Sequence, residues 1–434
     1  MDKMADVLGR AGAWCGQNKY LSAIKNAFQN FMPLTIAGAI GVLWCNVLVN
    51  ESTGLGIFFK PIMALEFLNP AFQAVNFCTI SCITVGITLG IAQEIGVWNM
   101  GAEKAGYIPG LVGLAAWLSV TNTSHMVEGA KEAFTGIAGN ELGATGLFTG
   151  MIIGVLSVEL FCFFEKQDAL KIKMPEQVPP GVARAFEVLV PATITLIITA
   201  CIGSACYNLT GLYLNDVIKN GIQGPLGAVG ATIPGVMIIY LVIMLFWLVG
   251  IHGNNMLSAV KEALFTPLAL ENVEKFNKGE KPTNIINMYF LQMCGEFGGS
   301  GVTIGLVIAI MIFGKREDNK AIASLSLVPG LFNINETVTF GIPMVLNPIL
   351  GIPFVVAPLI TIIIGYVLTV IGFCPVACLT VPWTTPPIVF GFLACGANVM
   401  GAVTQAILIV VSTVIYVPFL ISYEKYQNKQ AAEA

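Results

Sequence analysis

Long apolar runs separated by short polar segments dominate the first half of the chain. Such runs lie at 31–49, 71–93, 106–121, 143–164, 185–208 and 229–251. Their lengths are close to the roughly 20 residues that an α-helix needs to cross a bilayer. No long alternation of apolar and polar residues indicates the strands of a β-barrel. The pattern therefore predicts that each of these runs is a membrane-crossing helix.

The second half is also apolar but is interrupted more often. Residues 256–277 carry too many charges to cross a bilayer, and their amphipathic pattern predicts a helix on the membrane surface. Residues 284–314 are broken by four glycines between positions 295 and 301, and we predict two short crossings there.

Two further segments, 321–342 and 374–396, contain Pro, Gly, Asn and Thr at membrane depth. Lipid does not tolerate irregular backbone, whereas a protein-lined aqueous cavity does. We therefore predict two re-entrant hairpins, and plain crossings at 344–372 and 400–422. The expected fold is an all-α polytopic membrane protein with about ten transmembrane helices, two re-entrant hairpins and surface amphipathic helices.

The same pattern divides the chain into four parts. We expect an amphipathic N-terminal helix at 1–30, a first transmembrane half at 31–228, a second half at 229–423 and a cytoplasmic tail at 424–434. Broken helices surround the binding sites of many transporters. Function is therefore expected in the second half.

Composition narrows the class of protein. Of the 434 residues, 56% are hydrophobic and 11% are charged, against about 25% charged residues in a soluble domain. A soluble globular enzyme and a disordered chain are excluded. The net charge of −4 leaves no basic excess for binding nucleic acid. Because most of the 11 cysteines lie in apolar runs and the histidines number only 2, we expect neither a metal site nor a cofactor.

The distribution of Lys and Arg predicts the orientation in the membrane. Loops 165–184 and 252–282 are basic, as is the N-terminal segment, whereas loops 50–70, 122–142 and 209–228 each contain a single Lys. Cytoplasmic loops carry the excess of positive charge in membrane proteins. We therefore expect the N terminus and the C terminus in the cytoplasm.

The end of the sixth apolar run carries a cluster of hydrogen-bonding groups. His252 and Gly253 are followed by Asn254 and Asn255, and Trp247 comes about a turn earlier. The cluster fits either a helix end closed by glycine or a set of donors and acceptors at the wall of a cavity. We take Trp247, Gly253, Asn254 and Asn255 as candidate substrate-binding residues.

The sharpest candidate for chemistry lies in the first predicted hairpin. Glu336 follows Asn333 and Asn335 within an apolar segment. A carboxylate there costs about 2.5–3.5 kcal/mol on insertion scales, so it must be paired, protonated or exposed to water. Amide and carboxylate groups together supply the donors and acceptors that a neutral polyol needs. We expect Asn333 and Asn335 to bind substrate, and Glu336 and His252 to form the central catalytic pair.

Two further segments offer candidate substrate contacts. Glu296 lies in a glycine-rich stretch without the Lys-Ser/Thr of a nucleotide-binding loop, so we interpret a helix break with Glu296 facing a cavity. Trp383 and Thr384 lie in the second predicted hairpin. An aromatic ring binds the C–H face of a sugar while polar groups bind its hydroxyls. Trp247 and Trp383 therefore suit the two sides of a saccharide.

Three motifs together carry a family resemblance that extends over essentially the whole chain. They are Gly250-Ile251-His252-Gly253, Asn333-Ile334-Asn335-Glu336 with Phe340-Gly341-Ile342-Pro343-Met344-Val345-Leu346-Asn347-Pro348, and Pro382-Trp383-Thr384-Thr385-Pro386-Pro387. With them the chain resembles the membrane permease (IIC) subunits of bacterial phosphoenolpyruvate-dependent sugar phosphotransferase systems, in the lactose/cellobiose/N,N′-diacetylchitobiose class. Thr337 stands where this class commonly has Pro, which changes the local hairpin but not the carboxylate.

The resemblance implies a homodimer in the bacterial cell membrane, with 31–228 forming the interface and one sugar bound in 229–423. It also implies that a cytoplasmic IIB subunit phosphorylates the sugar from its own catalytic Cys, and that IIB and IIA are other polypeptides. Glu336 would orient the attacking hydroxyl and accept its proton, and His252 would bind a neighbouring hydroxyl or hold the carboxylate. The chain would then take part in sugar phosphorylation without carrying the phosphoryl donor.

Two other functions fit the residues alone. In a proton-coupled sugar symporter, Glu336 and His252 would relay protons. A channel or structural membrane protein would need no coupled reaction. The polar groups at membrane depth argue against the channel, and the resemblance favours the permease over the symporter. The identity of the β-linked disaccharide stays open between the cellobiose, lactose and diacetylchitobiose types.

Overall fold

The computed structural model describes residues 10, 14, 17–51, 56, 59–125, 134–175, 177–342 and 344–433. Much of the predicted helix at 1–30 before residue 17, and Pro343 of the second motif, lie outside these residues. The described chain forms two compact units. We call Gln17–Gly38 with Val75–Ala228 the N-terminal unit, and Ala39–Ala74 with Val229–Ala434 the C-terminal unit.

Helices make up most of the described chain. The strands β1 (Ser124–His125) and β2 (Phe134–Thr135) form a short antiparallel pair, with Ser124 opposite Thr135. The prediction of an all-α protein is confirmed. The first long helix, α2 (Lys19–Leu43), begins well before the apolar run from which it was predicted.

The N-terminal unit is a bundle of apolar helices. Its long members are α4 (Ile83–Met100), α6 (Ile108–Val120), α8 (Ala144–Glu165) and α9 (Pro180–Thr210); shorter elements are α5 (Ala102–Ala105), α7 (Gly139–Leu142), η5 (Asp168–Leu170), α10 (Leu214–Ile218) and η6 (Lys219–Gln223). A glycine lets α8 approach α4 closely, because a Cβ at Gly150 would lie 2.2 Å from Oγ1 of Thr88. Small residues give membrane helices this kind of close packing.

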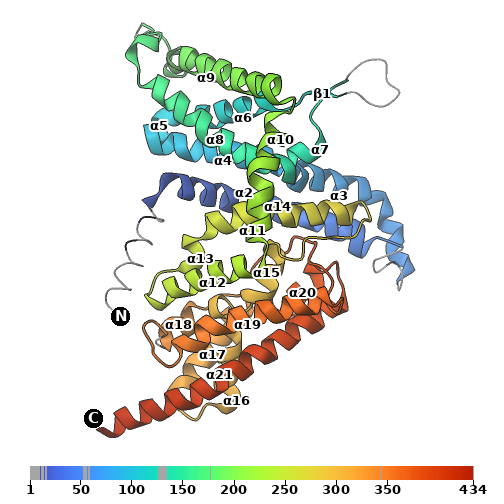
Figure 1. The fold of residues 1–434 in the computed structure, drawn as a ribbon, viewed down its shortest axis with the longest axis vertical. Coiled ribbons are helices and arrows are strands. Elements are labelled where there is room, and N and C mark those ends of the chain that lie inside the picture. The colour runs from blue at the N-terminus through green and yellow to red at the C-terminus, as the bar shows by residue number, and fades with distance from the viewer. Residues whose placement is uncertain are drawn as a thin grey trace. The chain divides into compact units, whose positions relative to one another are not determined.

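The C-terminal unit combines long helices with short, broken ones. The long helices are α12 (Ile233–Leu248), α14 (Ser258–Asn277), α16 (Ile304–Phe313), α17 (Glu317–Leu331), α19 (Gly351–Val370) and α21 (Val399–Glu433); the short ones are α13 (Gly253–Met256), α15 (Met288–Gly295), η7 (Ser300–Val302), α18 (Glu336–Gly341) and α20 (Val389–Ala394). The segment Ala39–Ala74 of this unit contains η1 (Trp44–Leu48), η3 (Lys60–Leu68) and most of α3 (Asn69–Asn76). α21 packs against α16, α19 and α20, and is the long red helix that ends at the C terminus in Figure 1.

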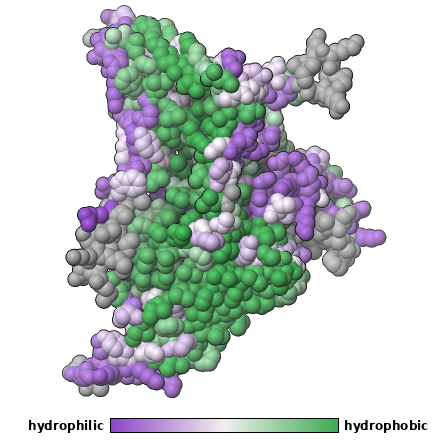
Figure 2. Space-filling model, in the orientation of Figure 1, coloured by the Kyte–Doolittle hydropathy of each residue, from purple (hydrophilic) through white to green (hydrophobic). Residues whose placement is uncertain are grey.

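Apolar side chains also cover the outside of this unit. On α21, the residues Val399, Val403, Ile407, Val410 and Val414 follow helical spacing and are all exposed. Figure 2 shows a broad apolar surface where α19 and α21 lie, replaced by polar residues toward the C-terminal end of α21. Such a stripe is stable against lipid and not against water. The helix therefore presents its outer face to a membrane.

Helix length gives the same result. Within the described residues, five helices are long and apolar enough to cross a membrane, or up to seven if each of two bent pairs is one span. The chain is an integral membrane protein. Where two short crossings are expected at 284–314, α15 has 8 residues and α16 has 10, and the chain is bent by 59° between Met288–Val302 and Ile304–Phe313. The glycines between α15 and α16 break the helix, because Gly298, Gly299 and Gly301 all have positive φ.

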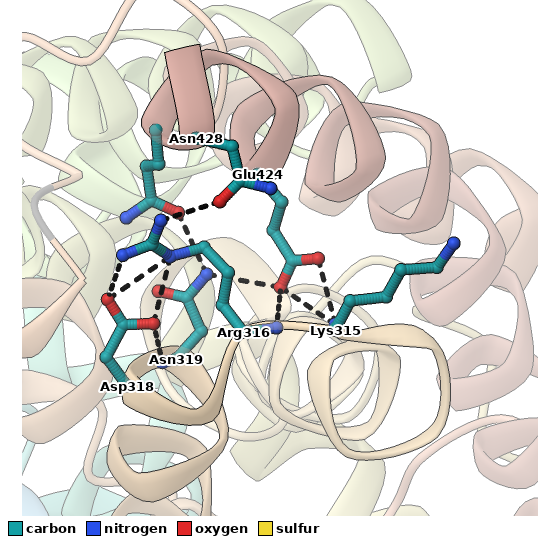
Figure 3. A network of polar contacts seen from close by, with 7 residues as sticks. Lys315, Arg316, Asp318, Asn319, Glu424 and Asn428 are labelled. Carbon is teal, nitrogen blue, oxygen red and sulfur yellow. Dashed lines mark hydrogen bonds and ion pairs between the residues drawn. The ribbon is translucent and has the colours of Figure 1, made fainter. Parts of the chain in front are cut away.

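The C-terminal part of α21 anchors the start of α17 (Figure 3). Glu424 is 5% exposed and accepts the backbone N–H groups of Lys315, at 2.9 Å, and Arg316, at 3.2 Å. Arg316 also donates to Asp318, at 2.6 Å, and to Asn428, at 2.7 Å. The hydrogen bond from Arg316 lowers the pKa of the Asp318 carboxyl below its ordinary value. α21 therefore continues as a helix through the residues predicted to be a tail.

Candidate functional site

A glycine ends α12 and turns the chain into the first predicted site. Gly250 has a φ of +81°, a left-handed conformation that glycine adopts at little cost. The N–H of Ile251 donates to the carbonyl of Phe246, and the N–H of Gly250 donates to that of Trp247, both at 3.0 Å. This is the Schellman arrangement of a helix C terminus. This stretch is therefore a helix C terminus, as one of the two interpretations expects. The turn at Gly250 directs the following residues, beginning with His252, toward the site.

His252 lies opposite Glu336, the first residue of α18. Its Nε2 is 3.7 Å from Oε1 of Glu336, and both side chains are partly exposed. Its Nδ1 accepts the backbone N–H of Asn255 at 3.3 Å, so in the neutral ring the proton is on Nε2, toward the carboxylate. The rings of His252 and Trp247 have their centroids 4.4 Å apart. These contacts fix both the tautomer and the direction of the imidazole.

Trp247 and Asn254 have unused hydrogen-bonding capacity. Trp247 is 1% exposed, and its Nε1 has no acceptor among the described residues. Oδ1 of Asn254 is buried and has no donor within the described part of the chain. Buried polar atoms are almost always hydrogen-bonded. Gly253 lies close to α12, where a Cβ would come within 2.0 Å of the carbonyl oxygen of Ile243.

Glu296 lies in a buried ion pair. Nζ of Lys261, on α14, contacts Oε1 of Glu296, and the two side chains are 7% and 16% exposed. The hydroxyl of Tyr240 donates to the same oxygen at 2.8 Å. Sequence reasoning missed Lys261 and Tyr240, because it took Lys261 for a charge that marks the cytoplasmic side. The available signal was Glu296 itself, since a carboxylate at membrane depth requires a partner.

Both asparagines of the Asn-Ile-Asn-Glu motif bind to other parts of the chain. Nδ2 of Asn335 donates to the carbonyl of Ser300, at 2.9 Å, and to Oγ1 of Thr339, at 3.1 Å. Oδ1 of Asn333 accepts the N–H of Gly298 at 2.6 Å, and its Nδ2 donates to carbonyls in the third motif. The motif thus connects the glycine-rich break after α15 with the segment that carries Trp383.

That segment doubles back on itself. The N–H of Cys378 donates to the carbonyl of Ala394 at 2.8 Å, which brings the two ends together. Trp383 is 43% exposed, and Thr384 is partly buried. Trp383 is therefore accessible from outside the protein, in contrast to Trp247.

A cavity of about 370 Å³ lies next to the end of α12, but its walls are almost wholly apolar. It is lined by Leu248, Val249, Leu346, Asn347, Pro348, Gly351, Ile352, Val355 and Val356. A neutral polyol needs donors and acceptors to replace its bonds to water. The polar residues around His252 and Glu336, and not this cavity, are therefore the candidate site.

Comparisons with known proteins agree on one family. The model of the family "Phosphotransferase system, EIIC" matches residues 25–358. The chain is 32% identical over 429 residues to the oligo-beta-mannoside-specific EIIC component of Bacillus subtilis (strain 168), covering 98% of this chain and 94% of that one. It is 30% identical over 486 residues to the cellobiose-specific EIIC component of Lactococcus lactis subsp. lactis (strain IL1403), covering 98% of each.

A solved structure has the same fold. The crystal structure of the transporter ChbC, the IIC component from the N,N′-diacetylchitobiose-specific phosphotransferase system, matches with a TM-score of 0.88 and 29% sequence identity. The match covers 97% of both chains. The similarity therefore includes the C-terminal unit and the residues described above.

Proposed function

The chain belongs to the phosphotransferase system EIIC family, and we propose that it binds a β-linked disaccharide, carries it across the membrane and presents it to a cytoplasmic IIB component for phosphorylation. EIIC components act together with IIB and IIA. The similar proteins are named for oligo-beta-mannosides, cellobiose and N,N′-diacetylchitobiose, which supports a β-linked substrate of the cellobiose or diacetylchitobiose type.

The observation that carries the proposal is the His252–Glu336 pair. Their separation of 3.7 Å is too long for a direct hydrogen bond, so both groups can face the hydroxyls of one bound sugar. The carboxylate of Glu336 would accept the hydrogen bond of the hydroxyl that attacks the phosphoryl group, and take its proton during transfer. The Nε2–H of His252 would donate to a neighbouring hydroxyl or hold the carboxylate. Phosphoryl transfer depends mostly on such positioning.

Nearby groups can complete a sugar site. The exposed ring of Trp383 would stack on one sugar face, with Thr384 beside it. Trp247 packs behind His252, and its buried Nε1, like Oδ1 of Asn254, could bind a sugar hydroxyl after a small movement. Gly253 and Asn255 would shape this wall, and Glu296 would act through its bond to Lys261.

The membrane arrangement is part of the same proposal. The apolar helices α6 and α12, of 13 and 16 residues, are shorter than the candidate spans; counted together with these, they support about ten crossings. The breaks at 321–342 and 374–396 would be re-entrant, with both termini in the cytoplasm of a bacterial cell. Two copies would pair through 31–228, where α9 exposes the apolar side chains of Ile197 and Ile202.

Uptake into vesicles separates the permease from the proton-coupled symporter. Purified protein would be reconstituted with labelled cellobiose outside, and with IIA, IIB and the phosphoenolpyruvate-dependent proteins that phosphorylate them inside. We expect sugar phosphate to accumulate with an uncoupler present, and no accumulation in matched vesicles without IIB. Accumulation of free sugar driven by a proton gradient, in the absence of IIB, would contradict the proposal and favour the symporter.

A further inference from the structure

Three breaks in helical structure meet around one side chain, that of Asn333. The first is the glycine-rich turn after α15, the second is the turn at 332–335 between α17 and α18, and the third is the segment 382–387. Irregular backbone in a membrane protein needs other partners for its N–H and C=O groups. Asn333 itself lies in the second break. Its side chain supplies hydrogen-bond partners to the backbone of the first and the third.

The amide of Asn333 is used by protein backbone on both sides. Oδ1 accepts the N–H of Gly298 at 2.6 Å. Nδ2 donates to the carbonyl of Trp383 at 2.5 Å and to that of Thr385 at 3.1 Å. An asparagine amide has two N–H donors, and both are engaged here. The side chain therefore has no donor left for a sugar hydroxyl.

The bonds from Nδ2 hold the tip of a turn. The N–H of Thr385 donates to the carbonyl of Pro382 at 2.9 Å, so Trp383 and Thr384 form the tip of a four-residue turn. Asn333 binds a carbonyl at the tip and another at the end of this turn. The backbone that carries the exposed ring of Trp383 is thereby fixed against the backbone of the Asn-Ile-Asn-Glu motif.

The same motif fixes Glu336. Asn335, the residue before Glu336, is 4% exposed and donates to the carbonyl of Ser300. Ser300 follows the glycine-rich turn to which Asn333 is bonded at Gly298. A Cβ at Gly299 would lie 2.6 Å from Cβ of Asn335, so the turn and the motif touch directly. Trp383 and Glu336 are thus held on one common support, although they are far apart in sequence.

We propose that Asn333 is a positioning residue that sets the place of Trp383 relative to Glu336, and that it does not itself bind the sugar. This inference rests on the proposed function, because it assumes that Trp383 stacks on the sugar. The backbone conformation fits the role: Asn333 has a φ of +63°, which asparagine tolerates better than most residues. The proposal replaces the expectation that Asn333 is a direct ligand.

Two variants separate the side-chain bonds from the backbone conformation. Asn333→Gly keeps the positive φ without strain and removes all three bonds. Asn333→Asp keeps the acceptor for Gly298 but loses the donor to the third motif. Asn398→Gly is the matched control, because Oδ1 of Asn398 accepts the N–H of Met400 at 2.9 Å in a break outside the three motifs.

The test is a double-mutant cycle with Trp383→Ala, read by equilibrium binding of cellobiose and, independently, by the thermal unfolding midpoint. We expect Trp383→Ala and both Asn333 variants to weaken binding about tenfold each, and each double variant to bind no more weakly than Trp383→Ala alone. The Asn398→Gly control should leave the affinity unchanged.

Each other outcome has one meaning. Additive losses would overturn the positioning role and make Asn333 a direct ligand. Normal binding by Asn333→Asp, or failure of both Asn333 variants to fold, would also overturn it, because Asn333 would then not act through the turn at Trp383. Normal binding by Trp383→Ala alone would instead reject the stacking in the proposed function.

Discussion

Replacement of Lys261 by Met tests the ion pair that sequence reasoning missed. The side chains of Lys261 and Glu296 are 7% and 16% exposed, so water screens the pair only weakly. Methionine has a similar length but no charge. It would leave the Glu296 carboxylate buried beside the neutral hydroxyl of Tyr240, which donates to it at 2.8 Å.

The expected loss follows from the charge that stays buried. Removing one partner of a buried ion pair typically costs about 3–5 kcal/mol, whereas replacing both by uncharged residues costs much less. We therefore expect Lys261→Met to lower the free energy of unfolding by about 3–5 kcal/mol. Adding Glu296→Gln to Lys261→Met should restore about 1–3 kcal/mol of this, and the coupling between the two positions is this gain plus the loss caused by Glu296→Gln alone.

The assay is unfolding of the purified protein in detergent micelles, with a control at the C-terminal end of the same helix. Lys278 pairs with Glu274 on α14 at 2.6 Å, but these side chains are 59% and 40% exposed. Lys278→Met should change the unfolding midpoint little, because water screens an exposed pair. Equal effects of the Lys261 and Lys278 substitutions, or additive losses in the double variant, would refute the reasoning.

Three further predictions concern packing and charge. Trp247→Ala should lower the unfolding free energy by about 3–5 kcal/mol through the cavity it leaves beside His252, and Trp247→Phe should lower it much less, as thermal unfolding can measure. Glu424→Ala should cost about 1.5–3 kcal/mol in the same assay, because two backbone N–H groups at the start of α17 lose a charged acceptor; a loss no larger than that of Glu424→Gln would contradict this. The bond from Arg316 lowers the pKa of Asp318, so its contribution to stability is complete above the ordinary value of 3.8 and is lost as the pH falls through the lowered value. The protection factors of amides at the start of α17, which are corrected for the intrinsic pH dependence of exchange, should therefore fall at acid pH in the wild type and show no such step in Asp318→Asn.

The sequence predicts the positions of the helices better than it predicts which side chains contact each other. The apolar runs at 143–164 and 185–208 correspond to α8 and α9, because bilayer thickness and local hydropathy set their length. The run at 284–314 predicts two short crossings, and the structure bends the chain by 59° at its glycines; glycine content alone does not reveal whether such a break bends one span or joins two. The sequence pattern assigns Lys261 of α14 to the positive charge that marks the cytoplasmic side of the membrane. Its burial depends instead on Glu296, which lies 35 positions further along the chain.

The candidate site shows the same limit. The motifs drew attention to Glu336 and His252, and the structure brings these side chains to 3.7 Å from each other. The residue types around them also identified a polar array. What the types could not give is the direction of each amide: Asn333 points at backbone carbonyls because its φ is +63° and because two other breaks lie beside it. Such direction is a tertiary property.

The most direct test of the account is phosphorylation by the Glu336→Gln variant. Glutamine keeps the shape and hydrogen-bonding capacity of the side chain but removes its charge and basicity. Equilibrium disaccharide binding and IIB-dependent formation of sugar phosphate would be measured on the same preparation, with Glu336→Ala for comparison. The account predicts that Glu336→Gln loses far more phosphorylation than affinity, while Glu336→Ala loses both. Normal phosphorylation by Glu336→Gln would contradict the role of Glu336 as the base.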